Sequence, residues 1–249
     1  MKSNQLTAPL LEKQLLSRLD KAIWEYKMFA KGDRILVCVS GGADSMLLLN
    51  LLSRRYTIYA GDLHLFALYV DMGFADGADR RCELIQIYFD TLGVNGKIVR
   101  TGIGPYAHSP ENLENPCFLC SRIRRKHIFA TAEELNCNKI VFAHHKDDIV
   151  ETLLLNMIFG REISTMTPFL PVHQGKYVII RPLVFVDEQM IKKLAGLTAL
   201  PVFDQQCPSN GNSKRQYIKD LLNKLEDDYY GARDNIFNSM KRVKNDYLL

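Results

Sequence analysis

The sequence predicts an α/β fold: a doubly wound, mostly parallel sheet with a helix before it and helices after it. Apolar runs typical of buried strands alternate with helical segments along most of the 249 residues. Two of these runs end in polar segments, Ser40-Gly41-Gly42-Ala43-Asp44-Ser45 and His144-His145-Lys146-Asp147-Asp148. Because such sheets bind ligands at the carboxyl ends of their strands, we expect both segments at that edge.

The elements are expected in the following order. A helical lead-in over residues 6–31 is followed by a strand at 34–39 and, after the glycine turn, by a helix to about residue 54. Strands at 63–70, 97–100, 139–142 and 177–182 alternate with helices at 77–92, 121–135, 149–159 and 188–197. Residues 101–116 form a loop, 200–203 a short extended piece, and 213–225 and 233–243 two basic amphipathic helices. We therefore expect a lead-in (1–30), an α/β domain (31–205) and a helical extension (206–249).

Composition indicates a globular chain outside the membrane. Hydrophobic residues make up 47% and charged residues 24%, and 32 basic against 28 acidic residues give a net charge of +4, which permits a nucleic-acid partner. No apolar stretch reaches the roughly 18 residues that span a bilayer, and the N-terminus lacks a secretory pattern. We expect a cytoplasmic protein with reduced thiols, so its six cysteines should be buried, catalytic or metal-binding.

The glycine turn at residues 40–45 predicts a phosphate site. Backbone N–H groups and the helix dipole would point at one spot, and two glycines let the backbone approach an anion. The hydroxyls of Ser40 and Ser45 add donors, and Asp44 suits a metal ion that accompanies phosphates. The alternative is an ordinary strand-to-helix turn with Ser or Asp as N-cap.

A third informative segment is the CxxC motif Cys117-Phe118-Leu119-Cys120, which is followed by basic residues. Such a pair is a redox dithiol, half of a zinc site, or part of an iron–sulfur site. Its place in mid-chain disfavours a thioredoxin-like dithiol, and the chain has no second CxxC. Cys207 is a candidate third ligand, and three thiolates suit a four-iron cluster with one open iron. Cys38, Cys82 and Cys137 are expected in the core or on an inert surface.

Two further residues belong to this reasoning. Arg124 lies one helical turn beyond Cys120 and could reach a polyphosphate in the glycine turn, with a solvated helix face as its alternative. Asp147 could N-cap the helix that follows it, or hold Mg²⁺ facing Asp44. His144 and His145 do not predict a joint metal site, because adjacent strand residues point to opposite faces.

Together these segments resemble the PP-loop ATP pyrophosphatase superfamily and, within it, the tRNA 2-thiocytidine synthetases, iron–sulfur sulfurtransferases related to the tRNA-lysidine synthetases. The family's SGGxDS loop matches residues 40–45, its CxxCSRxRR segment 117–125 and its HHxDD segment 144–148. Its IRPL segment matches 180–183, and its late cysteine followed by RQ matches Cys207, Arg215 and Gln216. The resemblance extends from about residue 10 to 245.

The resemblance implies an adenine nucleotide alpha-hydrolase-like fold and an enzyme that adenylates cytidine 32 of tRNA and replaces its 2-oxygen with sulfur. The implied catalytic residues are Cys117, Cys120, Arg124 and Asp147. The implied ATP-binding residues are Ser40, Gly41, Gly42, Ala43, Asp44, Ser45, Asp71, Met72 and His144. The implied cofactors are ATP, a [4Fe-4S] cluster on Cys117, Cys120 and Cys207, and Mg²⁺ on Asp44 and Asp147.

The implied partners are tRNA and a cysteine desulfurase or another sulfur donor. No membrane partner is expected, and a homodimer is possible. Basic residues of the C-terminal helices are candidates for gripping tRNA phosphates, with plain solubility as the alternative: Lys214, Arg215, Lys219, Arg233, Lys241, Arg242 and Lys244.

The chain departs from the family pattern at three positions. Ala43 stands where the 2-thiocytidine synthetases usually have lysine, Ala143 where they have glycine, and Asp204 where they often have a further cysteine. Two alternative functions therefore stay open. One is a related enzyme that acts on another nucleoside or removes sulfur, and the other is a non-catalytic iron–sulfur or zinc-binding module.

Overall fold

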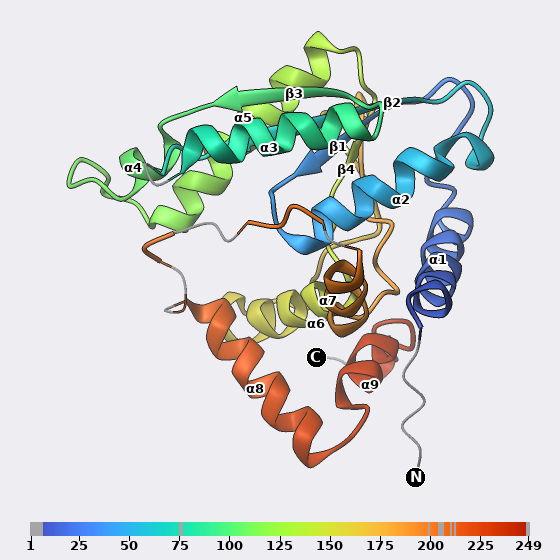
Figure 1. Cartoon of the computed structure of the whole chain (residues 1–249). Helices are drawn as coiled ribbons and strands as arrows, with labels where there is room; N and C mark the ends of the chain where they lie inside the picture. The colour runs from blue at the N-terminus through green and yellow to red at the C-terminus, as the bar shows by residue number, and fades with distance from the viewer. Residues whose placement is uncertain are drawn as a thin grey trace.

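The computed structural model describes residues 7–74, 77–198, 200–203, 207–209, 211 and 213–247. A six-stranded sheet lies at its centre, with helices on both faces (Figure 1). The strands are β1 (Arg34–Val39), β2 (His64–Asp71), β3 (Asn95–Arg100), β4 (Lys139–Val141), β5 (Phe169–Val172) and β6 (Tyr177–Ile180). The strand order is β3-β2-β1-β4-β6-β5, and every neighbouring pair is parallel except β5 and β6. The predicted doubly wound, mostly parallel sheet is thus confirmed.

The helices are α1 (Ala8–Glu25), α2 (Ala43–Tyr59), α3 (Ala78–Thr91), α4 (Ile103–Ala107), α5 (Pro116–Glu134), α6 (Lys146–Leu155), α7 (Glu188–Leu197), α8 (Lys214–Asp228) and α9 (Ala232–Ser239). A π-helical turn, η1 (Asn156–Gly160), follows α6, and a 3₁₀ turn, η2 (Asn245–Tyr247), lies near the C-terminus. Among the described residues, none of these helices is long and apolar enough to cross a bilayer.

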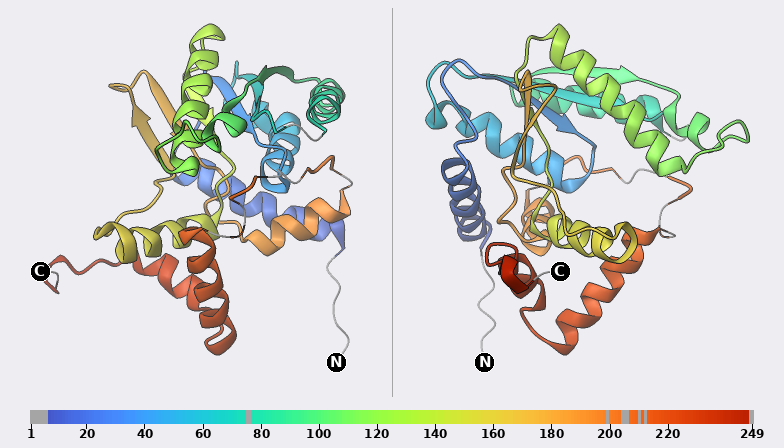
Figure 2. Two further views of the ribbon diagram at one scale, coloured as in Figure 1. Left: turned by 90° about the vertical axis from the view of Figure 1, so that its left-hand side faces the viewer. Right: turned by 180° about the vertical axis from the view of Figure 1, so that it is seen from behind.

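The sheet is buried on both faces, which explains why its strands are nearly continuous apolar runs. Ile35, Val37 and Val39 of β1 pack in one cluster with α1, α2, α3 and α7. Leu36 and Cys38 point to the other face, where α5 covers them. Figure 2 shows α5 on one side of the sheet and α2 and α3 on the other.

The two terminal parts differ in how they attach. The buried face of α1 belongs to the same cluster as the sheet, so the lead-in packs as part of the α/β unit. Helices α8 and α9 lie beyond α6, away from the sheet (Figure 1), and a separate small cluster of Val150, Ile218 and Leu222 joins α8 to α6. The domain boundaries proposed from sequence stay a prediction, and the one at 205/206, like Asp204, falls at residues outside the described ranges.

Several boundaries differ from the sequence prediction. Helix α5 begins at Pro116, five residues before the expected start, because the Asn115 side chain caps it by accepting the Phe118 N–H at 3.2 Å. Helix α6 begins at Lys146 rather than 149, since the Asp148 carboxylate accepts the His145 N–H at 3.0 Å. The expected loop at 101–116 contains α4, and the short edge strand β5 was not predicted.

Candidate active site

The candidate active site lies at the carboxyl ends of β1 and β4. These two strands are neighbours, but the connections that follow them lead to α2 and α6 in different parts of the fold. Such a switch point opens a crevice beside the sheet. The glycine turn and the His144–Asp148 segment both lie there, as the sequence predicted.

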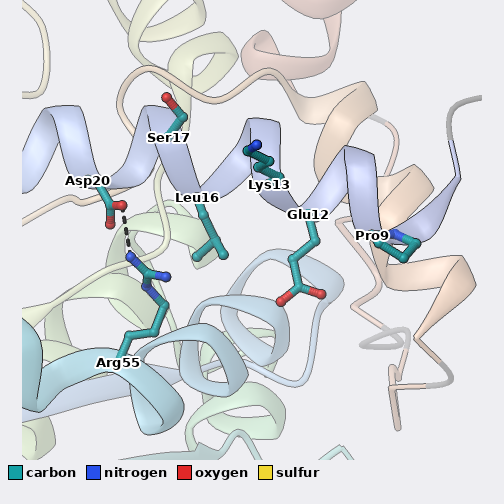
Figure 3. A pocket seen from close by; sticks show the side chains of 7 residues that line it. All are labelled: Pro9, Glu12, Lys13, Leu16, Ser17, Asp20 and Arg55. Atoms are coloured by element: carbon teal, nitrogen blue, oxygen red, sulfur yellow. Dashed lines mark hydrogen bonds and ion pairs between the residues drawn. The ribbon is translucent and has the colours of Figure 1, made fainter.

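Away from this crevice, a hollow between α1 and α2 has a volume of about 560 Å³ (Figure 3). Three of the charged side chains that line it have partners: Arg55 pairs with Asp20 at 2.9 Å, and Glu12 pairs with Arg54 at 2.8 Å. No site residue proposed from sequence lines it. We therefore do not assign the chemistry to this hollow.

The glycine turn is held in shape by its own serines. The Ser45 hydroxyl accepts the Ser40 N–H at 3.0 Å and lies 3.1 Å from the Gly42 carbonyl, to which it donates. Gly41 has φ +86°, a conformation that favours glycine. The N-cap of α2 is Gly42, with no side-chain cap, so the alternative of a Ser or Asp cap is wrong. The first N–H groups of α2 are therefore left for a ligand, as at helix ends that bind phosphate.

Asp44 lies in a cluster of carboxylates. Burial raises its pKa, and the nearby charges of Asp148 and Glu188 raise it further, while His145 and Lys192 oppose them. A divalent cation would relieve this repulsion, and oxygen ligands of this kind suit Mg²⁺. Among the described residues, no group of three or more His, Cys, Asp or Glu side chains is close enough to hold a metal ion, so Mg²⁺ would bind here through one or two carboxylates together with nucleotide phosphates and water.

Asp147 has other contacts. One of its carboxylate oxygens accepts the Glu188 N–H at 2.8 Å, and the other accepts Arg233 Nη1 at 3.2 Å. These bonds attach α6 to α7 and α9. The role of Asp147 as a Mg²⁺ ligand stays a prediction, and Asp148 is the neighbouring residue whose charge acts on Asp44.

His144 is held as a neutral imidazole. Burial lowers its pKa to about 4, and Arg181 Nε lies 3.3 Å from its Nδ1. Since the guanidinium donates, Nδ1 is an acceptor and Nε2 bears the proton. His144 can then donate a hydrogen bond to an anionic ligand without titrating near neutral pH.

Arg124 extends from α5 toward the end of β1. Its charge acts on the Cys38 thiol, whose pKa burial raises to about 12. The Nε of Arg124 is buried and has no hydrogen-bond partner within the described part of the chain. An unpaired buried donor is costly, so this position favours an anionic ligand.

Two of the three predicted ligand cysteines, Cys117 and Cys120, lie in the first turns of α5, and Cys207 lies near Cys120. Cys117 is exposed, Cys120 and Cys207 are half-buried, and all three are free thiols. Burial raises the pKa of Cys120, and the neighbouring Cys207 and Cys117 raise it further. In the described ranges, no group of three or more such side chains is tight enough for a single metal ion. A multi-iron cluster is broader, since each thiolate binds a different iron, and its positive irons would offset the repulsion between thiolates.

The remaining cysteines, Cys38, Cys82 and Cys137, are buried in the core as predicted. Sequence reasoning missed His108, which contacts Cys207. Its Nε2 is 3.8 Å from Cys207 Sγ and 2.9 Å from the Ser209 hydroxyl. Nothing in the sequence marked this histidine, because it follows α4 in what was expected to be an irregular loop.

One short segment joins the glycine turn to the cysteines. The Phe203 N–H donates to the Gly41 carbonyl at 2.9 Å, and the Phe203 ring lies against Gly41. Cys207 follows four residues later, and four residues span at most about 14 Å. Cys207 therefore lies within about 14 Å of Phe203, which contacts the glycine turn.

Comparison with known proteins is consistent with this geometry. A family model described as a PP-loop domain matches residues 11–225. The chain belongs to the PP-loop family.

Two curated relatives are similar over nearly the whole chain. A tRNA-cytidine(32) 2-sulfurtransferase of Methylobacillus flagellatus is 37% identical over 245 residues, which cover 96% of this chain and 78% of the relative. A protein of the same name from Escherichia coli (strain SMS-3-5) is 35% identical over 254 residues, covering 99% and 79%.

Among solved structures, the U34-tRNA thiolase NcsA from Methanococcus maripaludis, with its [4Fe-4S] cluster, superposes with a TM-score of 0.79. The match covers 97% of this chain and 81% of that chain, at 21% identity. At this identity the likeness shows the fold, and it agrees with the PP-loop assignment.

Two other predicted nucleotide-binding residues lie where β2 ends. Asp71 and Met72 are buried at its carboxyl end, beside β1. The turn after them requires glycine, because Gly73 has φ +78° and a Cβ there would lie 2.1 Å from the Thr101 carbonyl oxygen. Their predicted contact with adenosine stays a prediction.

Several basic residues expected to grip tRNA have partners inside this PP-loop protein. Arg233 bonds Asp147, Lys219 pairs with Glu188 at 2.7 Å, and Arg215 lies 3.6 Å from Asp148. These residues attach α8 and α9 to the site. Lys214 and Lys244 instead lie over exposed aromatic rings.

Proposed function

We propose that this protein is an ATP-dependent tRNA sulfurtransferase that converts cytidine 32 to 2-thiocytidine. The main support is the bond between Phe203 and Gly41, which holds the segment before Cys207 against the glycine turn, with Cys117, Cys120 and Cys207 all free thiols. The names of the curated relatives supply the substrate, tRNA, and its modified position.

The first step we propose is adenylation of the base. The 2-oxygen of cytidine attacks the α-phosphate of ATP, and the bond to the β-phosphate breaks, which releases pyrophosphate. The uncapped N–H groups of α2 bind the phosphates, and the guanidinium of Arg124, a half-buried residue whose Nε has no partner in the described part of the chain, donates to the charge that develops on the leaving group. Asp44 would hold Mg²⁺, together with a second carboxylate of the same cluster.

In the second step sulfur at the sulfide level attacks C2 of the base, the C2–O bond breaks, and the oxygen leaves as part of AMP. Cys117, Cys120 and Cys207 would hold a [4Fe-4S] cluster, which when bound supplies an open iron for carrying sulfur. Cys117 is the most exposed of the three cysteines, so we infer that the sulfur donor and the base approach the cluster from the side of Cys117. His108 lies against Cys207 and restrains the segment that bears it.

The proposal includes the cellular setting. The sulfur donor would be a cysteine desulfurase or another sulfur carrier, and the protein would act in the cytoplasm where its tRNA substrate is found. A homodimer is compatible with the proposal, but no contact among the described residues requires one.

The test is a thionucleoside analysis of tRNA from cells that lack the protein. We expect 2-thiocytidine to disappear, and to return when the wild-type gene is restored. Unchanged 2-thiocytidine would refute this target, and loss of another thionucleoside would indicate the related enzyme on a different base.

A variant separates the two halves of the site. Cys207→Ala should lose iron in anaerobic purification yet still bind ATP, whereas Cys82→Ala, which changes a core cysteine on α3, should retain both. Unchanged iron content in Cys207→Ala would remove this residue from the cluster site, and a colourless wild-type protein with stoichiometric zinc would contradict the cluster itself.

A further inference from the structure

An open groove lies between η1 and the first turns of α8. Its volume is about 590 Å³, and Phe159, Lys214 and Tyr217 line it. Phe159 is 40% exposed and Tyr217 60% exposed, and their ring centroids lie 6.3 Å apart. The Lys214 ammonium lies 4.9 Å from the centroid of the Phe159 ring. The groove therefore presents two accessible rings beside a cation.

The walls of this groove lead directly from the candidate active site. Helix α6 begins at the His144–Asp148 segment and continues into η1, while α8 follows Cys207 along the chain. Arg215, next to Lys214, donates to the Thr152 hydroxyl at 3.0 Å and fixes α8 against α6. Figure 1 shows the start of α8 beside α6. A polymer with one unit in the active site would place neighbouring units along this groove.

We propose that the groove binds an unpaired nucleotide of the RNA substrate, with its base stacked on Tyr217 or Phe159 and a phosphate paired with Lys214. The inference rests on the proposed function, and it adds a binding site for the RNA nucleotides next to the target base. Aromatic faces with a cation beside them are the usual means by which proteins hold single-stranded RNA, because every base has a face that can stack.

The chemistry of the groove favours RNA over a protein partner. Apolar side chains on and after η1, Met157, Ile158 and Ile163, are also exposed and would suit a protein contact. Ile158 belongs to the groove itself, but polar side chains line it as well, among them Ser213, Gln216 and Asp220. The Asp220 carboxylate accepts Gln216 Nε2 at 2.9 Å, while Lys214 places a positive charge over the Phe159 ring. A polyanion complements this charge.

The test measures binding of a fluorescently labelled anticodon stem–loop RNA to the full-length protein by anisotropy. Tyr217→Phe retains the ring and should bind like the wild type. Tyr217→Leu retains apolar bulk without the ring, and its Kd should rise about 5- to 100-fold. Lys214→Gln should lower the slope of log affinity against log salt concentration by about one. Tyr230→Leu, which changes a 98% exposed tyrosine beyond the other end of α8, is the matched control and should change nothing.

The outcomes separate this inference from the proposed function. If the wild type fails to bind the stem–loop, the tRNA function fails, and the groove assignment fails with it. If the wild type binds and thiolates RNA while Tyr217→Leu and Phe159→Leu both bind equally well, only the groove assignment is wrong. A Tyr217→Leu variant that loses self-association in sedimentation, with RNA affinity unchanged, would identify the groove as a protein contact. Crosslinks from a 4-thiouridine in the loop to peptides of η1 or α8 would support the assignment.

Discussion

The backbone N–H of Phe203 donates a hydrogen bond of 2.9 Å to the carbonyl of Gly41. This bond connects the glycine turn, for which we propose phosphate binding, with the segment that leads to Cys207. Gly41 has a positive φ, so its carbonyl is turned toward this neighbour rather than into the turn, which forms its own bonds through Ser40 and Ser45. The two halves of the site are therefore expected to respond together when this contact is broken.

Phe203→Pro removes both the donor and the ring that lies against Gly41, and we expect it to weaken ATP binding and cluster loading together. The loss of one hydrogen bond is worth about 1 kcal/mol, or roughly fivefold in affinity. Calorimetry with a non-hydrolysable ATP analogue and the iron content after anaerobic purification measure the two effects. Val202→Ala, which trims an exposed side chain of the same segment, should change neither quantity. A fall in ATP affinity with unchanged iron would show that the halves are independent.

Arg124 and Arg125 are adjacent on α5 but differ in their surroundings. Arg125 is exposed, whereas the Nε of Arg124 is buried without a hydrogen-bond partner in the described ranges. We expect Arg124→Met to lower the rate of pyrophosphate release about 100-fold, because a donor to the leaving group is lost. Its free energy of unfolding should stay equal or rise, since an unsatisfied buried group is removed. Arg125→Met should retain the rate, and equal losses in both variants would contradict the assigned role of Arg124.

Sequence patterns predicted the parts of the site that are local. The glycine turn, the CxxC and the segment at 144–148 are short, and the positions of β1 and β4 follow from apolar runs, so the edge where they meet could be predicted. Contacts between distant residues could not be predicted in the same way. The bond from Arg233 to Asp147 spans 86 residues, and the contact of His108 with Cys207 spans 99. Each depends on how helices pack, which no local pattern encodes.

The neutral state of His144 predicts a pH dependence of stability. Burial holds the pKa of the folded-state imidazole at about 4, below its ordinary value of 6.5. As the pH falls below 6.5 the unfolded chain takes up a proton and the folded protein does not, so the free energy of unfolding decreases until the pH reaches about 4. The expected loss between pH 7.5 and 5 is about 2 kcal/mol.

Urea unfolding at these two pH values measures this effect. His144→Gln cannot take up a proton and should reduce the difference between them, whereas His64→Gln, which changes an exposed histidine, should retain the wild-type difference. Because the pKa of Asp44 is raised in the folded protein, protonation of Asp44 at lower pH increases the free energy of unfolding and opposes the effect of His144. The test therefore compares the variants with the wild type. A His144→Gln variant with the full wild-type dependence would show that another group is responsible.

The adjacent carboxylates Asp147 and Asp148 provide the test of the magnesium site. Asp147 is bonded to Arg233 and to the Glu188 N–H, so Asp147→Asn should weaken the attachment of α9 and lower the free energy of unfolding by about 1–3 kcal/mol. Asp148 acts on Asp44 and also caps α6, a role that asparagine can fill. Asp148→Asn keeps this cap but removes the charge that faces Arg215, so it should lower the free energy of unfolding by less than Asp147→Asn does. It should raise the Mg²⁺ concentration for half-maximal pyrophosphate release about tenfold, because one anionic ligand is lost. Titration of the pyrophosphate-release rate with Mg²⁺, alongside urea unfolding, separates the two effects. A higher Mg²⁺ requirement in Asp147→Asn, with none in Asp148→Asn, would support the ligand predicted from the sequence and exclude Asp148.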